Sequence, residues 1–270
     1  MLRKMFLLVP LVGEVTLLDS PSWLPPAAVM LELYLDLLSQ PCRAVYIFAK
    51  KNNIPFMVKN IDMLKGQQFT EEINKVNILR KVPVLKDGDY TLEESTAILL
   101  YLTRKYNTPS HWYPPDMKKR GRVDEYLAWQ HSTIRPGASK ILWLKVVIPI
   151  FLGQQVPPEK LQDAVEDLTL SLRKLEDKFL QDKSFIVGSE ISLADLVAVT
   201  ELMQPLGAGW DVFEGRPKLL EWRRRVESAV GKELFMEAHG RILNTSELKS
   251  IRIDAPMQAQ IKPMLLKMLK

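Results

Sequence analysis

The order of strand and helix patterns between residues 31 and 60 constrains the fold of this chain most strongly. Apolar and polar residues alternate over residues 31–36, which is the period-two pattern of a strand with one buried face. A helix is expected immediately afterwards, because Pro41 suits the first position of a helix and apolar residues follow it. Residues 56–60 carry a second strand pattern. A strand, a helix and a strand at this spacing predict two parallel neighbouring strands.

A hairpin and a further helix are predicted next along the chain. Two short apolar runs, residues 82–85 and 90–92, flank the turn sequence DGD. Glu94 and Ser95 then precede a helical pattern that extends to Tyr106. The resulting order, β-α-β followed by β-β-α, is that of an α/β thioredoxin-like domain.

The remainder of the chain has the pattern of an all-α domain. Residues 108–115 contain three prolines and are predicted to form an interdomain linker. Apolar residues recur at spacings of three and four over residues 161–179, as in an amphipathic helix. We therefore predict a thioredoxin-like domain at 30–107, the linker, and an all-helical domain at 116–270.

Two further helix signals lie in the second domain. Ser192 and Asp195 have the spacing of a capping box at a helix start, and its loss should cost about 1 kcal/mol of stability. Apolar residues at 261, 264, 265 and 268 predict an amphipathic helix at the C-terminal end.

Residues 1–29 differ in character from the rest. Their basic start, apolar run and Ala27-Ala28 pair would fit a signal peptide with its cleavage site. We favour the other interpretation, an extension that is disordered or precedes the native start at Met30. The sequence after Met30 has the character of a cytosolic protein, and its single cysteine, Cys42, excludes an intrachain disulfide. We therefore expect a cytoplasmic protein.

Charge and metal-ligand content exclude several classes of function. The net charge is +5, and residues 241–270 hold six basic and two acidic residues, so the rest of the chain is close to neutral. A basic stripe interleaved with aromatic residues is missing, so we expect no nucleic-acid partner. We also expect no membrane partner, because the apolar run near the start is too short to span a bilayer. The three histidines are scattered, so we expect no metal site.

Ser39 lies where the first strand meets its helix, and two interpretations apply to it. As a helix cap it would satisfy backbone groups. As a catalytic group it would donate a hydrogen bond to a thiolate held at the positive end of the helix. Lowering a thiol pKa from about 8.5 by two units needs roughly 2.7 kcal/mol. One charge-assisted hydrogen bond of about 1.5–3 kcal/mol, together with the helix dipole, supplies that.

Two other features share this end of the predicted domain. Val82-Pro83 precedes the hairpin, and in thioredoxin-like folds this proline is cis and the preceding backbone pairs with an extended peptide. At the next helix start, Ser95 can hold a carboxylate and Glu94 can pair with an α-ammonium group. Each feature alone has an ordinary structural explanation. Together they predict a site for a small peptide with a thiol and an amino-acid head, as in glutathione.

Five segments carry a specific resemblance. Residues 31–44 (LELYLDLLSQPCRA), 81–88 (KVPVLKDG), 125–131 (EYLAWQH), 191–196 (ISLADL) and 213–217 (FEGRP) resemble theta-class glutathione transferases. The resemblance covers Met30 to Lys270. It implies a thioredoxin-like glutathione-binding domain followed by an all-helical domain that binds the electrophile.

The resemblance also implies roles for individual residues. Ser39 matches the serine that activates the thiol, and Arg135 matches an arginine that stabilises leaving-group charge. The residues implied in glutathione binding are Gln40, Gln68, Lys81, Val82, Glu94 and Ser95. Gln68 departs from the family, which usually has histidine there, and can donate a hydrogen bond but not a charge. Weaker glutathione binding is the expected result.

The implied activity is transfer of the glutathione thiolate to electrophilic small molecules such as alkyl or aryl halides, sulfate esters and epoxides, with reduction of organic hydroperoxides as a second activity. Glutathione would be a co-substrate, with no bound cofactor, and the resemblance implies a homodimer. The alternative is a non-catalytic binding or scaffold protein of the same fold. Such proteins usually lose the thiol-activating residue, whereas this chain has Ser39.

Overall fold

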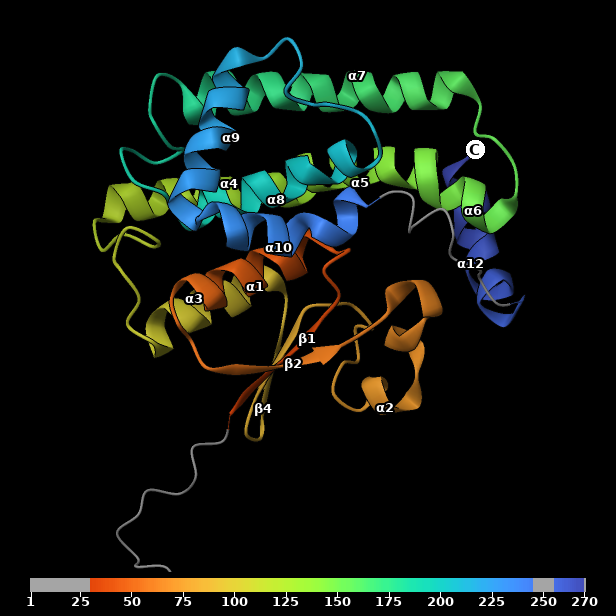
Figure 1. Ribbon diagram of the computed structural model, residues 1–270, viewed down its shortest axis with the longest axis horizontal. Coiled ribbons are helices and arrows are strands. Elements are labelled where there is room, and N and C mark those ends of the chain that lie inside the picture. The colour runs from red at the N-terminus through yellow and green to blue at the C-terminus, as the bar shows by residue number, and fades with distance from the viewer. Residues whose placement is uncertain (1–29, 245–254, 270) are drawn as a thin grey trace, which may run out of the picture.

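The computed structural model describes residues 30–244 and 255–269. Within these residues it consists of a mixed α/β domain followed by a helical domain, as the sequence predicted (Figure 1). Both interpretations of residues 1–29 lie outside the described residues. The side chains of Met264 and Met268, which belong to the predicted C-terminal apolar stripe, also lie outside them.

The first domain is built on a four-stranded sheet in the order β2-β1-β3-β4. β1 (Leu31–Leu35) and β2 (Phe56–Asn60) are parallel, as expected for a βαβ unit. β3 (Val84–Asp87) pairs antiparallel with both β1 and β4 (Tyr90–Glu93), which confirms the predicted hairpin. The alternating leucines of β1 are buried, so one face of the sheet contributes to the core.

Two helices of this domain cover the sheet. α1 (Gln40–Lys51) connects the parallel strands, and α3 (Ser95–Lys105) follows the hairpin. Nine residues of α1 are buried because the helix lies between the sheet and helices α8 and α10 of the second domain (Figure 1). Between β2 and β3 the chain forms short helical turns at η1 (Met63–Lys65), η2 (Gln67–Phe69) and α2 (Glu71–Asn74).

No helix or strand lies between α3 and α4, where the sequence predicts a linker at 108–115. The domain boundaries themselves stay a prediction. The helical domain described here comprises α4 (Met117–Ser132), α5 (Ile134–Leu142), the π-helical η3 (Trp143–Val147), α6 (Ile148–Leu152), α7 (Pro158–Lys174), the π-helical η4 (Leu175–Leu180), α8 (Leu193–Gly207), α9 (Pro217–Val230), α10 (Lys232–Leu243) and α12 (Ala255–Met268).

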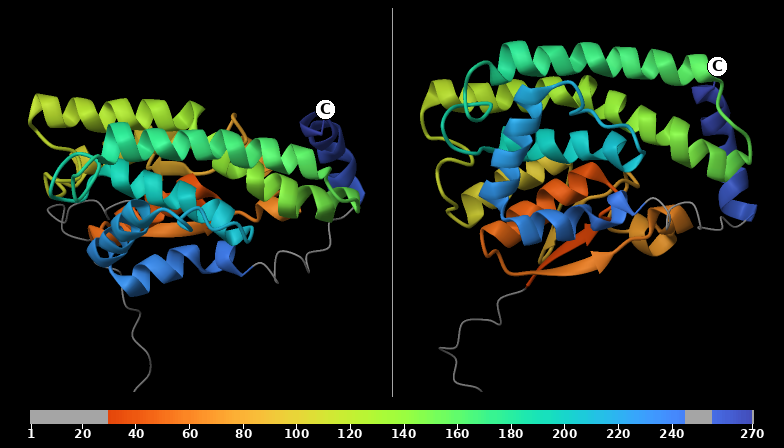
Figure 2. Two further views of the ribbon diagram at one scale, coloured as in Figure 1. Left: turned by 90° about the horizontal axis from the view of Figure 1, so that it is seen from above. Right: turned by 45° about the horizontal axis from the view of Figure 1, so that its top comes forward.

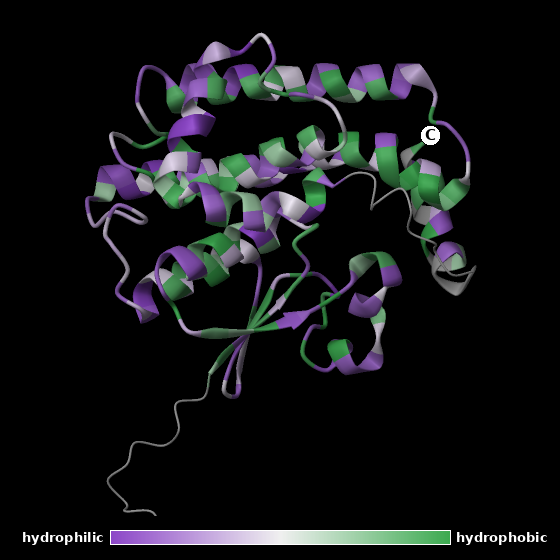
Figure 3. Ribbon diagram, viewed as in Figure 1, coloured by the Kyte–Doolittle hydropathy of each residue, from purple (hydrophilic) through white to green (hydrophobic). Residues whose placement is uncertain are grey.

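The helical domain packs around α8. Fourteen of the fifteen residues of α8 are buried, because α1, α4, α5, α9 and α10 surround it. In the outer helix α7, hydrophobic and hydrophilic residues alternate along the length, as expected for a helix with one buried face (Figures 2 and 3). α12 lies beside α6, and Leu265 is buried there.

Two findings refine the predicted helices. The amphipathic pattern over residues 161–179 continues into η4, where the Gln181 N–H donates to the Glu176 carbonyl in π-helical fashion. At the end of α8, a Cβ added to Gly207 would lie 2.4 Å from the Ile242 carbonyl oxygen. Glycine therefore permits the close approach that places the end of α10 against α8.

Asp195 has a larger role than a helix cap. Its carboxylate is fully buried and accepts hydrogen bonds from the Ser192 N–H and hydroxyl, the Ile186 N–H and the Trp222 indole. Burial raises the pKa of Asp195, and the four donors oppose that shift. The carboxylate thus joins the start of α8 to the preceding loop and to α9, so we expect its loss to cost more than the roughly 1 kcal/mol of an ordinary helix cap.

None of the helices in the described part of the chain combines the length and apolar character that a membrane crossing requires.

Candidate active site

Ser39 ends the turn that leads from β1 into α1. Its N–H donates to the Asp36 carbonyl at 2.9 Å, and its own carbonyl accepts the Arg43 N–H, the first bond of the helix. The backbone is extended, as at a helix cap, but the hydroxyl makes no capping hydrogen bond to the backbone. No acidic residue lies in the first turn of α1. The helix therefore presents its positive end and a serine hydroxyl, with no acidic side chain in its first turn.

Cys42 is a packed residue and not a nucleophile. The side chain is fully buried one helical turn after Ser39, and burial raises the pKa of its thiol to about 12, although a hydrogen bond from Ser39 opposes the shift. A thiol with this pKa stays protonated at neutral pH. The chemistry predicted at this turn therefore rests on the serine hydroxyl.

The register of the sheet places the predicted site residues at one edge. Leu35 at the end of β1 pairs with Asn60, Tyr34 pairs with Val84, and Val84 pairs with Glu93. The segments that continue from these positions carry the predicted residues. They are Ser39 and Gln40 after β1, Gln68 after β2, Lys81 and Val82 before β3, and Glu94 and Ser95 after β4.

The Val82-Pro83 peptide bond is cis, as the sequence predicted. Val82 is buried, whereas Lys81 is exposed. Asn77 holds this segment: its side-chain amide donates to the Lys81 carbonyl at 2.5 Å and accepts the Lys81 N–H at 3.4 Å. Asn77 is fully buried, and no sequence pattern pointed to it.

Glu94 precedes α3 with a positive φ of 66°. Residues other than glycine rarely adopt this conformation, and it is a strained one that concentrates at functional sites. The side chain of Glu94 is exposed, while that of Ser95 is buried. The first turn of α3 contains no acidic residue, so no side chain of that turn competes with an anion for its positive end.

Arg135 on α5 joins this edge through Ser95. One guanidinium nitrogen, Nη2, lies 3.4 Å from the Ser95 hydroxyl, and Nε donates to Glu201 on α8 at 2.7 Å. Glu201 is fully buried; burial raises the pKa of its carboxyl and Arg135 lowers it. The Glu201 Oε2 atom has no hydrogen-bond partner among the described residues. Glu201 was not predicted, because it lies 66 residues from the arginine it orients.

Gln40 and Gln68 are each held by neighbours. The Gln40 amide donates to the Ser139 hydroxyl of α5 at 2.6 Å. The Gln68 amide donates to the Met63 carbonyl at 3.3 Å, and its Oε1 atom is buried without a hydrogen-bond partner among the described residues. The side-chain nitrogen of Gln68 has a second N–H, which can donate to an anionic ligand.

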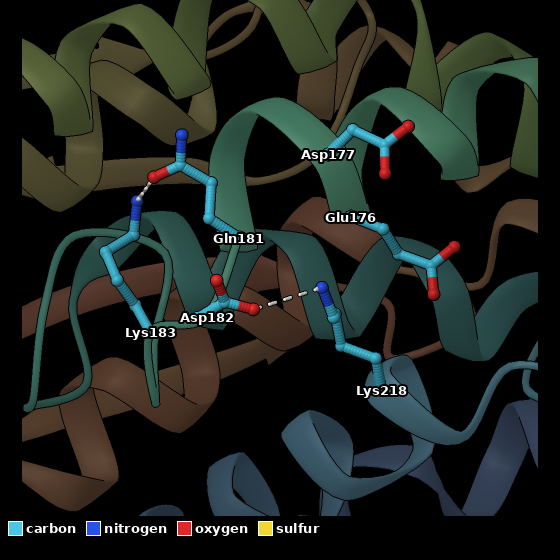
Figure 4. A pocket seen from close by; sticks show the side chains of 6 residues that line it. All are labelled: Glu176, Asp177, Gln181, Asp182, Lys183 and Lys218. Carbon is cyan, nitrogen blue, oxygen red and sulfur yellow. Dashed lines mark hydrogen bonds and ion pairs between the residues drawn. The ribbon is translucent and has the colours of Figure 1, made fainter.

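A separate surface cavity lies between η4 and the start of α9 (Figure 4). Glu176, Asp177, Gln181, Asp182, Lys183 and Lys218 line it. Its charges are partly paired, since Lys218 lies 3.7 Å from Asp182 and Arg216 lies 2.8 Å from Glu176. It contains none of the predicted site residues. Nowhere among the described residues do three or more histidine, cysteine or acidic side chains gather as a metal site would require.

Comparison with protein families supports the assignment of both domains. Residues 33–110 match the model of the glutathione S-transferase N-terminal domain, and residues 135–229 match that of the C-terminal domain. Glutathione S-transferase theta-1 of Gallus gallus is 58% identical over 259 residues, covering 89% of this chain and 99% of that protein.

Two solved structures are similar throughout. The apo form of human glutathione S-transferase T1-1 is 58% identical with a TM-score of 0.84, covering 89% of this chain and all of that one. A human theta-class glutathione transferase in complex with the glutathione conjugate of 1-menaphthyl sulfate is 46% identical with a TM-score of 0.85, covering 90% of this chain and all of that one.

Proposed function

Because this chain belongs to the theta class of the glutathione S-transferase family, we propose that it uses Ser39 to stabilise the glutathione thiolate for attack on an electrophile. The chain is a glutathione transferase, and glutathione is its co-substrate. The observation that carries the role of Ser39 is its hydroxyl, buried at the start of α1 and not consumed by a backbone cap.

The proposed chemistry needs only modest stabilisation of the glutathione thiolate relative to the thiol. Glutathione binds with its sulfur beside the Ser39 hydroxyl, which donates a hydrogen bond to the thiolate. The positive end of α1 adds to this, because its first turn carries no competing acidic side chain. The thiolate then forms a bond to an electrophilic carbon, and the leaving group departs with the electron pair. A pKa depression of about two units would leave most of the bound thiol ionised at neutral pH.

The rest of the sheet edge is proposed to hold the tripeptide. The backbone of Val82 pairs with the cysteinyl backbone of glutathione. Gln68 and the exposed Lys81 hold the glycine carboxylate, and Gln40 lines the pocket beside the sulfur. The Ser95 hydroxyl and N–H donate to the γ-glutamyl carboxylate at the positive end of α3, and the exposed Glu94 pairs with the γ-glutamyl ammonium group.

Arg135 is proposed to stabilise negative charge on the departing group. Glu201 supports this role, because it fixes the guanidinium through a 2.7 Å hydrogen bond and leaves further N–H donors available. The 3.4 Å approach of Nη2 to the Ser95 hydroxyl adds a second proposed role. In that position Arg135 also brings positive charge to the γ-glutamyl carboxylate.

For substrates, we propose alkyl and aryl halides, sulfate esters and epoxides, with organic hydroperoxides reduced as a second activity. The glutathione conjugate of 1-menaphthyl sulfate in the human relative supports the sulfate-ester class. We further propose that the protein works as a cytoplasmic homodimer without another cofactor, a proposal that rests on the family.

Kinetics of Ser39→Ala test the proposal against the non-catalytic alternative. We expect the variant to bind glutathione with a similar dissociation constant by calorimetry, while kcat for a halide or sulfate ester falls about a hundredfold. Ser39→Thr, which keeps a hydroxyl, should retain more activity than Ser39→Ala. Wild-type protein that binds glutathione without turning over any of the proposed electrophiles would favour the binding module.

A further inference from the structure

Arg241, near the end of α10, contacts the two loops that follow β1 and β2. Its guanidinium forms an ion pair with Asp36, and Nη2 lies 3.3 Å from the Asp62 carboxylate. The Asp36 carboxylate is fully buried, whereas the Asp62 and Arg241 side chains are each 27% exposed. One side chain of the helical domain thus reaches two separate loops of the first domain.

Asp36 is the first residue of the turn that carries Ser39. Its carbonyl accepts the Ser39 N–H at 2.9 Å, and its carboxylate accepts the Leu38 N–H at 2.8 Å. The same carboxylate accepts the Met63 N–H at 3.0 Å, at the start of η1. The orientation of Asp36 therefore affects both the proposed catalytic turn and the segment after β2.

Asp62 organises that second segment. Its carboxylate accepts the Leu64 N–H at 3.1 Å and so caps η1, while its N–H donates to the Gln67 side chain at 2.8 Å. Gln68 follows directly, and its amide donates to the Met63 carbonyl. A shift of η1 would consequently move Gln68, which is proposed to hold the glycine carboxylate.

The charge at Asp36 also matters for a nearby thiolate. Burial raises the pKa of Asp36, while the N–H bonds from Met63 and Leu38, and then Arg241, oppose the shift. A buried anion close to Ser39 opposes formation of a second anion there. The charged and titratable groups that face Asp36 are Arg241 on α10, Asp62 after β2, and Arg43 and Cys42 on α1.

Arg43 is already engaged elsewhere. It is fully buried and donates to the carbonyls of Leu37, Leu38 and Thr200 and to the Gln204 side chain. These bonds clamp the peptide groups of the Ser39 turn onto α8. Among residues 30–244 and 255–269, Arg241 is the cation that pairs with the Asp36 carboxylate itself.

We propose that Arg241 is a positioning residue for the transferase reaction: it holds the Ser39 turn and the Gln68 segment in one arrangement and balances the buried Asp36 charge. This inference rests on the proposed roles of Ser39 and Gln68. Arg241 touches neither residue, and it acts through Asp36 and Asp62. Because it spans both loops, its loss should affect the thiol end and the glycine end of glutathione together.

Arg241→Gln, Arg241→Lys and a matched control, Arg216→Gln, test the inference. Arg216 forms a similarly shielded ion pair with Glu176 at 2.8 Å, beside the surface cavity at η4 and α9. The measurements are the glutathione dissociation constant by calorimetry, the pKa of the bound thiol by ultraviolet absorbance, and kcat and KM. Arg241→Gln should weaken glutathione binding about three- to tenfold. It should also raise the bound-thiol pKa by about half a unit to one unit.

The two substitutions at Arg241 separate charge from geometry. Lysine keeps the positive charge but not the guanidinium fork that reaches both carboxylates. Compared with Arg241→Gln, Arg241→Lys should therefore bring the bound-thiol pKa most of the way back to the wild-type value, but the glutathione affinity less far. If Arg241→Gln matches Arg216→Gln in affinity, thiol pKa and KM, the inference is wrong, even where its melting temperature falls. Failure of the proposed function would appear differently, as a wild-type thiol pKa that Ser39→Ala leaves unchanged.

Discussion

Replacing Asp195 by asparagine should destabilise the protein by about 2–4 kcal/mol, well above the contribution of an ordinary helix cap. The substitution replaces one carboxylate oxygen by an NH₂ group, and asparagine has nearly the same shape as aspartate. The structure provides the magnitude, because each carboxylate oxygen of this fully buried group has its own set of donors.

The Oδ1 atom of Asp195 accepts the Ile186 N–H at 2.8 Å and the Trp222 indole N–H at 2.9 Å. The Oδ2 atom accepts the Ser192 N–H at 3.0 Å and its hydroxyl at 2.9 Å. In asparagine one oxygen becomes an NH₂ group that cannot accept. The Ser192 N–H then loses its acceptor, at about 1–3 kcal/mol, and the bonds that remain weaken because the acceptor is neutral. Removing a buried charge offsets part of this cost.

Asp116→Asn is the matched control. Asp116 caps α4 by accepting the Lys119 N–H at 2.9 Å, but its side chain is exposed, and asparagine caps helices as well as aspartate does. We expect a loss below about 0.5 kcal/mol there. Urea unfolding, followed by tryptophan fluorescence and circular dichroism, gives both free energies. A loss for Asp195→Asn within 1 kcal/mol of the control would refute the reasoning.

Three further outcomes are expected. Gln68→His should tighten glutathione binding about threefold or more, because histidine can bring positive charge to the glycine carboxylate, and calorimetry showing no tightening would contradict this. Burial lowers the pKa of His239 from 6.5 to about 3. Between these two pH values the histidine is protonated in the unfolded chain but neutral in the folded chain, so the folded state loses stability as the pH falls. When the pH is lowered from about 7 to 5, the free energy of unfolding should therefore fall by about 2 kcal/mol more in wild type than in His239→Gln. Equal losses in the two proteins would contradict the lowered pKa of His239. Arg135→Lys keeps the positive charge but not the planar guanidinium that contacts both Glu201 and Ser95, so kcat/KM should fall about tenfold. An unchanged kcat/KM would contradict both roles proposed for Arg135, at the leaving group and at the γ-glutamyl carboxylate.

Local patterns predicted the elements of the first domain because burial of one face leaves a period in the sequence. The leucines of β1 alternate, and Pro41 and Ser39 identify the start of α1. The location of the site follows from topology. In a βαβ unit with an added hairpin, the segments that follow β1, β2 and β4 lie at the same end of the sheet as the segment that precedes β3.

Long-range pairs had no such signal. Arg135 meets Glu201 across 66 residues, and Arg241 meets Asp36 across 205. A charged residue on a helix looks the same in sequence whether it faces water or a buried partner. The sequence also gives no signal for the positive φ of Glu94, because the connection between β4 and α3 imposes it. The supporting groups of the site therefore emerge only once the helices are packed.

The most direct test of the account is the pKa of the glutathione thiol bound to the protein, measured by ultraviolet difference absorbance in wild type and Ser39→Ala. The account predicts a bound-thiol pKa about two units below the free value in wild type, returning toward about 8.5 in the variant. An unshifted pKa in wild type, or a depressed one that persists without the hydroxyl, would contradict the role of Ser39.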